Sequence, residues 1–162
     1  MRHRNAGRKL GRKSAQRTAL RRHIVCSLFR IGRIETTLAK AKEFRPWAEK
    51  MITTAKTGAA ALAAGDTITH LNAYRRLLAA LHDEDIVVHV IGEIAPKFAD
   101  RQGGYTRVLK NAMARLGDSA PTAVFELVGF DAEADAARKS DARAALAARR
   151  KAREASPTPS EA

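Results

Sequence analysis

The sequence has 162 residues, 45% of them apolar, which suffices for one domain with a modest core. Its formal net charge of +13 indicates a polyanionic partner, and nucleic acid is the leading candidate. An anionic membrane is disfavoured as the partner because aromatic residues make up only 5% of the sequence, and no apolar run is long enough to span a bilayer. The single cysteine excludes an internal disulfide.

The first 33 residues carry most of the excess charge, with eleven Lys and Arg and no acid, whereas the other 129 residues hold 19 cations against 17 acids. Residues 1–13 contain Gly-Arg-Lys twice and have almost nothing to bury, so we predict a basic arm that orders only on its partner. A solvated tail and an organellar transit peptide share this composition and are the alternatives. The expected nucleic-acid contacts in the arm are Arg2, His3, Arg4, Arg8, Lys9, Arg12 and Lys13.

A helix is predicted to begin at the N-cap Ser14 and to end at Gly32. One face of it is apolar at helical spacing, through Leu20, Ile24, Val25, Leu28 and Phe29. Three cations fall largely on the other side and are expected to contact nucleic acid: Arg17, Arg21 and Arg22. Residues 33–37 are short and rich in β-branched side chains, which predicts a strand.

A second helical face runs from Leu38 to about Thr57, where Pro46 either kinks one helix or separates two. We interpret Trp47 as core packing, with base stacking as the alternative. Lys40 is a further expected nucleic-acid contact. Residues 58–65 are alanine-rich and are expected to be a connector.

Asp66 is expected to cap a third helix, whose apolar side carries Ile68, Leu71, Leu77 or Leu78, and Leu81. The acids of residues 83–85 favour another helix start, and the spacing of apolar residues over 86–95 predicts a helix that Pro96 ends.

Residues 101–110 pass from a diglycine turn into a strand, residues 116–121 supply a turn, and residues 122–128 form a returning strand. This segment holds a second expected contact set: Arg101, Gly103, Gly104, Tyr105, Arg107 and Lys110. Two glycines allow close backbone approach, Tyr105 offers stacking, and the cations offer phosphate contacts. A hairpin entry with incidental charges is the alternative.

Together these elements predict an α/β fold of the α+β type, with a small three-stranded sheet packed by about four helices. We expect a basic arm over residues 1–13, a folded body over 14–130 and an alanine-rich tail over 131–162, partly helical or disordered.

No sequence motif supports enzyme chemistry, a small-molecule substrate or a cofactor. Asp85, His89 and Glu93 share one helical face, but such a ladder spreads over about 12 Å, too far for one metal ion. We therefore expect no catalytic and no metal-binding residues.

Several motifs, in order along residues 1–130, carry a resemblance to a known family. They are Met1-Arg2-His3-Arg4, the basic stretch 7–13, Thr36-Thr37-Leu38 before Lys40-Ala41-Lys42-Glu43, Arg45-Pro46, Thr54-Ala55-Lys56, Ala95-Pro96-Lys97-Phe98, Gly103-Gly104-Tyr105-Thr106-Arg107, and Ala120-Pro121 before Glu126-Leu127-Val128. Each is weak alone, but together the chain resembles the bacterial large-subunit (50S) ribosomal protein seventeen family, L-seventeen.

The resemblance implies a structural, ribosomal-RNA-binding protein of the cytoplasmic large ribosomal subunit. It implies an arm that enters 23S ribosomal RNA near the polypeptide exit tunnel, with the large-subunit proteins L-twenty-two and L-thirty-two as neighbours. The alanine-rich residues 58–65 and the tail after residue 131 depart from the family pattern. An architectural DNA-binding protein is the alternative function.

Overall fold

The described part of the chain, His3 and residues 7–129 of a computed structural model, combines helices with one antiparallel sheet. Its elements are α1 (Ser14–Ile31), β1 (Arg33–Thr37), α2 (Leu38–Ala63), α3 (Thr67–Leu81), α4 (Glu84–His89), the π-helix η1 (Val90–Ile94), α5 (Ala95–Lys97), β2 (Thr106–Ala114) and β3 (Pro121–Leu127). This arrangement confirms the predicted α+β class. The predictions for Arg2, Arg4 and residues 131–162 concern residues outside this part.

The sheet has the strand order β1-β3-β2 with both pairs antiparallel, so the last strand lies between the two earlier ones. Ile34, Phe125 and Val108 stand side by side in the ladder, and Phe125 is fully buried on the core side. Neighbouring residues along a strand point to the opposite side. We call that side the outer sheet face; its first row is Arg33, Glu126 and Arg107.

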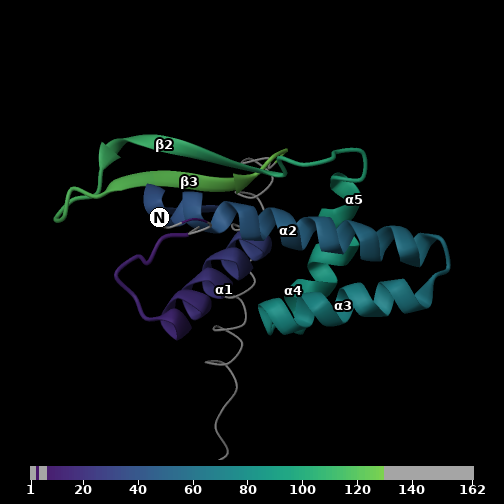
Figure 1. Cartoon of the computed structure of the whole chain (residues 1–162). Helices are drawn as coiled ribbons and strands as arrows, with labels where there is room; N and C mark the ends of the chain where they lie inside the picture. The colour runs from purple at the N-terminus through teal and green to yellow at the C-terminus, as the bar shows by residue number, and fades with distance from the viewer. Residues whose placement is uncertain (1–2, 4–6, 130–162) are drawn as a thin grey trace, which may run out of the picture. The chain divides into compact units, whose positions relative to one another are not determined.

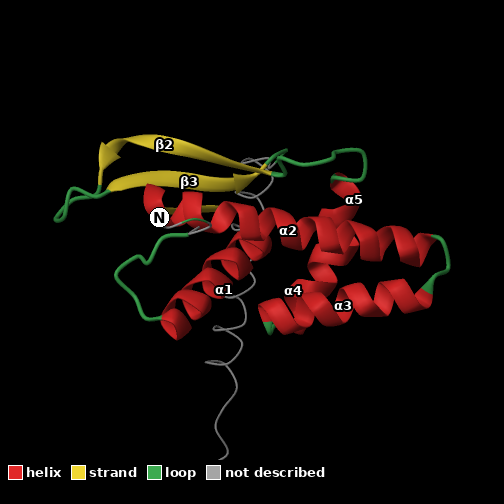
Figure 2. Cartoon of the chain, viewed as in Figure 1, coloured by secondary structure: helices red, strands yellow, loops and turns green. Residues whose placement is uncertain are grey.

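Helix α2 lies between the sheet and the other long helices, with α1, α3 and α4 on the side away from β2 and β3 (Figure 1). Its buried face confirms the predicted periodicity and consists of Ala41, Phe44, Ala48, Met51, Ile52, Ala55, Gly58 and Ala61. The hairpin of β2 and β3 extends past the helices in Figure 2. The core therefore supports the base of the hairpin and leaves its turn outside.

Helix α1 ends as predicted, because Gly32 adopts a φ of 84° and its N–H donates to the Leu28 carbonyl over 2.7 Å. Its start differs by one residue. Lys13 occupies the N-cap position and Ser14 is the first helical residue, with the Lys13 N–H donating to Gln16 Oε1 over 3.4 Å.

The length of α2 decides two sequence predictions: the effect of Pro46 and the connector over residues 58–65. The helix runs unbroken through Pro46, because Phe44 and Ala48 on either side bury against the same core. The connector expected over residues 58–65 is wrong, since α2 continues to Ala63. Alanine is the strongest helix former, and Gly58 allows α3 to approach so closely that an added Cβ would lie 2.9 Å from the Ala73 Cβ.

The buried face of α3 is Ala73, Leu77 and Leu81. The prediction that Ile68 and Leu71 would join it is wrong, because they are 73% and 44% exposed. The reason is the close approach at Ala73, which turns that stripe of α3 toward α2. The predicted cap is confirmed, since Asp66 Oδ1 accepts from the Thr69 N–H over 3.1 Å.

The prediction that Pro96 ends a helix is also wrong in detail. The helical run passes from α4 through the π-turn η1 into α5, where Pro96 lies in the first turn. Proline is tolerated there because the N–H groups of a first turn have no partner within their own helix. The wider π-turn just before it thus lets the chain continue to Lys97.

Candidate nucleic-acid interface

The described arm residues 7–13 present four exposed cations: Arg8, Lys9, Arg12 and Lys13. None of the four makes an ion pair within the part of the chain that the structure describes. The sequence predicted an arm that orders only on its partner, but in the structure residues 7–13 contact the body. Leu10 packs half-buried against the core, and an added Cβ on Gly7 would lie 3.1 Å from Glu43 Oε1. The arm is thus anchored at Leu10 while its charges stay available.

The arginines of α1 are less available than their spacing suggested. The Arg21 guanidinium lies over the Trp47 ring, with Cζ 4.8 Å from the centroid, and its Nε is buried with no hydrogen-bond partner among the residues described. Arg22 Nε donates to the Ala80 carbonyl over 3.2 Å. Both side chains therefore fasten α1 to α2 and α3, and Trp47 is half-buried beneath Arg21.

Two further contacts hold the C-terminal half of α1 in place. Arg30 Nη2 and Asp83 Oδ2 form an ion pair at 2.9 Å, and the Cys26 thiol donates to the Leu81 carbonyl over 3.7 Å. Burial raises the pKa of the Cys26 thiol, which fits the predicted packing role. Arg17 remains as the α1 cation closest to the arm, and its Nη1 donates to the Arg12 carbonyl over 3.5 Å.

The turn of Gly103 and Gly104 requires glycine because both residues have positive φ values. Gly103 and Gly104 have φ values of 154° and 64°, and nothing lies within 4 Å of a Cβ added to either. Lys56 Nζ donates to the Arg101 carbonyl over 2.5 Å, while Arg101 Nε donates to the Gly103 carbonyl over 3.2 Å. The turn is therefore open to a ligand and held from beneath by α2.

Replacing Gly104 by Ala is expected to destabilise the fold by about 1 to 2 kcal/mol, because a side chain disfavours the left-handed backbone conformation. Gly92 is the matched control. A Cβ there also meets open space, but its φ is not positive, so Gly92→Ala is expected to be neutral or to stabilise by up to about 1 kcal/mol. Urea denaturation of both variants measures the difference, and equal effects would mean that the turn tolerates any residue.

Two other members of the second predicted contact set, Tyr105 and Arg107, make contacts within the protein that leave them less available to nucleic acid. Tyr105 is only 3% exposed and packs on Phe98, with ring centroids 5.3 Å apart, so its ring belongs to the core and the predicted stacking on a base does not fit. Arg107 donates to Glu126 Oε1 from Nε and Nη2, at 2.8 and 2.6 Å. Its charge is thus largely compensated within the sheet.

A groove of about 530 Å³ between α2 and β2 is lined by two cations that the sequence did not predict as nucleic-acid contacts. Lys42 and Arg45 line it together with the predicted Lys110, around an apolar floor of Leu38, Pro46 and Val108. Glu49 in the same groove accepts from Arg45 Nε over 3.0 Å. The helical spacing of residues 38, 42, 45 and 49 is the signal that would have placed them on one face.

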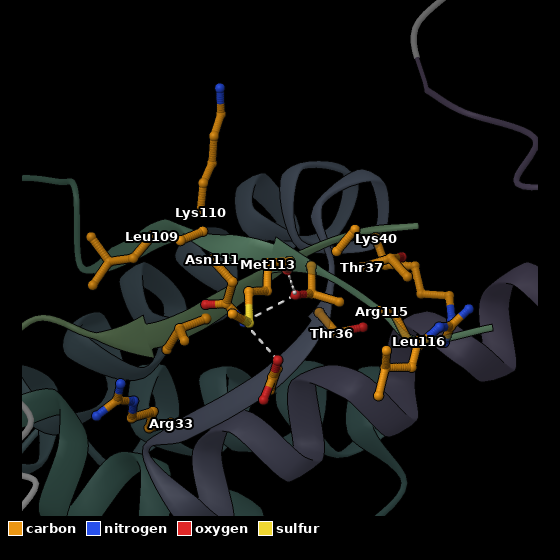
Figure 3. Close-up of a pocket in the computed structure, with 15 residues that line it drawn as sticks. Arg33, Thr36, Thr37, Lys40, Leu109, Lys110, Asn111, Met113, Arg115 and Leu116 are labelled. Atoms are coloured by element: carbon orange, nitrogen blue, oxygen red, sulfur yellow. Dashed lines mark hydrogen bonds between the residues drawn. The ribbon is translucent and has the colours of Figure 1, made fainter. Parts of the chain in front are cut away.

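A larger hollow of about 970 Å³ lies along the hairpin and the end of β1, and Lys40 and Lys110 are among its lining residues (Figure 3). Met113 lies between Leu109 and Leu116 in this view, while Lys110 points away from them. The hollow therefore presents apolar side chains, whereas the arm presents cations.

Two other classes of site were tested against the described residues. His89 Nδ1 lies 3.4 Å from Glu93 Oε1, but no group of three side chains in residues 7–129 is arranged to hold a metal ion. In the same range, every helix is too short or too polar to cross a membrane.

Known proteins match this chain over most of its length. The family model of ribosomal protein L17 matches residues 20–128. The large ribosomal subunit protein bL17 of Desulfotalea psychrophila is 49% identical over 131 residues, 81% of this chain and 92% of that protein. Proteins of the same name from Sulfurovum sp. and Campylobacter lari are 48% and 44% identical over 128 residues, 79% of this chain and 100% and 99% of theirs.

Proposed function

Because the chain belongs to the ribosomal protein L17 family, which is a family of ribosomal structural proteins and not of enzymes, we propose that it is a structural constituent of the large ribosomal subunit that binds its 23S ribosomal RNA. The observation that carries the RNA-binding part is the cluster of four exposed arm cations without an acidic partner in the described chain. Such a cluster gains free energy by displacing counterions from a phosphate backbone.

The body has the role of holding this arm in one place. Leu10 anchors the arm at the core, and α1 is fixed by the contacts of Arg21, Arg22 and Arg30. The arm cations then reach RNA from a rigid base, so less conformational entropy is lost on binding than for a free tail. Arg17, at the arm's junction with α1, belongs to the same contact surface.

Further RNA contacts are proposed along two edges of the body. The first is the groove of Lys42, Arg45 and Lys110, and the second is the open turn of Arg101, Gly103 and Gly104. The groove offers exposed cations and the turn offers exposed backbone, and both kinds of surface bind phosphate and ribose rather than base edges. From the family resemblance we also propose a position near the polypeptide exit tunnel, beside L-twenty-two and L-thirty-two.

Sedimentation tests the proposal as a whole. In a sucrose gradient the full-length protein, carrying an affinity tag, is expected to travel with large subunits and to stay with them after a high-salt wash. The free protein should also bind 23S ribosomal RNA more tightly than duplex DNA of equal length at the same salt concentration. Sedimentation with the nucleoid, together with equal affinity for DNA, would favour the architectural DNA-binding alternative, which the family relationship does not favour.

A further inference from the structure

The β2–β3 hairpin exposes three large aliphatic side chains on the hollow shown in Figure 3. Leu109 is 42% exposed, Met113 84% and Leu116 98%. Single exposed apolar residues are common on protein surfaces, but a group that rims one hollow of about 970 Å³ is typical of a contact surface. Met113 and Leu116 gain little from burial within the isolated fold, so a partner that covered them would gain the free energy of burying them.

Part of the positive charge at this surface is compensated by neighbouring carboxylates. Glu126, only 4% exposed, lies between Arg107 and Arg33, whose Nε is 3.4 Å from Glu126 Oε2. Arg115 pairs with Asp118 at 2.5 Å, and its hydrogen bond lowers the pKa of Asp118 to about 2, so this pair stays ionised at neutral pH. Two of the four cations that line the hollow, Arg33 and Arg115, are thus each paired with a carboxylate.

The polar groups on the floor of the hollow are satisfied in the same way. Asn111 Nδ2 donates to Glu35 Oε1 over 2.6 Å and to Thr122 Oγ1 over 3.0 Å. No aromatic side chain lines the hollow, so unpaired bases find no stacking platform there. Lys40 and Lys110 line the hollow and make no ion pair with any described residue, and Lys110 points away from the three apolar side chains (Figure 3).

From these observations we propose that the hollow is the docking surface for an apolar segment of a neighbouring protein of the large subunit, with a carboxylate of that segment paired to Lys40. The inference rests on the ribosomal placement proposed above but not on RNA binding by the arm. An apolar centre with partly compensated charge around it is the composition of a protein–protein contact, whereas RNA interfaces are strongly positive. Aliphatic side chains of the partner would cover Met113 and Leu116 and exclude water from them.

Photo-crosslinking inside the subunit tests this proposal. The full chain carries benzoylphenylalanine in place of Leu109, and large subunits purified from those cells are irradiated. The expected result is a crosslink to one ribosomal protein, mapped by mass spectrometry to a segment with aliphatic residues and an Asp or Glu. A crosslink to RNA, a crosslink to a second copy of this chain, or no crosslink in subunits that contain the protein would overturn the proposal.

A matched pair of variants tests the chemistry of the contact. Met113→Asp with Leu116→Asp is expected to reduce the crosslink per incorporated protein at least tenfold, because two carboxylates would have to be buried. Leu62→Asp with Ile68→Asp alters two residues that are 55% and 73% exposed at the far end of α2 and α3, and should leave the crosslink unchanged. An undiminished crosslink in the first variant would also contradict the proposal.

The outcome is separable from the failure of the proposed function. Both double variants alter only exposed side chains, so circular dichroism and the affinity of the free protein for 23S ribosomal RNA should match those of the unaltered chain. If the unaltered chain itself does not enter large subunits, the proposed function is wrong. If it enters them and binds RNA but makes no protein crosslink at Leu109, only the docking surface is wrong.

Discussion

Replacing Arg8, Lys9, Arg12 and Lys13 together by Gln is expected to weaken binding to 23S ribosomal RNA roughly 100-fold or more near physiological salt. Each cation that contacts a phosphate releases counterions, so the slope of log affinity against log salt should become shallower by roughly 3 if all four make contact. Full-length protein is used because Leu10 packs on the core and must stay in place. Filter binding over a salt series gives both quantities.

The control for this experiment removes the same charge from elsewhere on the body. Lys50, Arg75, Arg76 and Lys97 are exposed and lie on helices outside both proposed RNA surfaces of the body. Replacing these four by Gln should leave the salt slope nearly unchanged, although the net charge falls equally. If the two variants lose affinity to the same extent, RNA responds only to total charge, and the assignment of the arm as the principal contact is wrong.

Replacing Leu28 by Ala is expected to destabilise the protein by about 3 kcal/mol, within the range of 2 to 5 kcal/mol for a buried leucine. Leu28 is fully buried on α1, and its removal leaves a cavity where α1 packs on the core. RNA affinity should then fall as well under mildly denaturing conditions, because the arm loses its rigid base. Urea denaturation followed by circular dichroism measures the change.

The same substitution at a fully solvent-exposed leucine provides the comparison. Leu116 is 98% exposed, so Leu116→Ala in the free protein should change the free energy of unfolding by less than about 0.5 kcal/mol. A loss at Leu116 as large as that at Leu28 would show that the hairpin turn is covered in the free protein. That result would also remove the basis for a docking surface there.

The elements with strong local signals could be predicted from the sequence. Gly32 ends α1 because a left-handed residue is needed there, and Asp66 caps α3 because its carboxylate reaches a free backbone N–H. Strand β1 follows from its β-branched residues, and β2 and β3 follow from the turn residues that bound them. These signals depend on residues a few positions apart, so no knowledge of the tertiary structure is required.

The errors arose where packing partners decide the outcome. Two apolar stripes are available on α3, and only the contact between Gly58 and Ala73 selects the one that is buried. The alanine-rich end of α2 becomes helical because it has α3 to pack against. Periodicity alone does not reveal either partner.

The same reason explains which candidate contacts could be predicted. The arm cations were predictable from charge alone, since they have no acid nearby in the sequence. Arg22 and Arg107, by contrast, bond to Ala80 and Glu126, which lie 58 and 19 positions away. Such pairing is invisible until the chain is folded, and it removes residues from a candidate interface that a charge count would include.

Because β3 lies between β1 and β2, the sheet cannot form during synthesis until β3 has been made. Ile34 of β1 pairs with Phe125, about ninety residues later in the chain. At ordinary rates of translation the partner strand is made roughly 5 to 20 s after β1. During that interval the arm and α1 already exist, while β1 has an open edge that other strands can join. A nascent chain that stalls before Pro121 would therefore present its cationic arm beside an unfinished sheet, a state in which misassociation competes with folding.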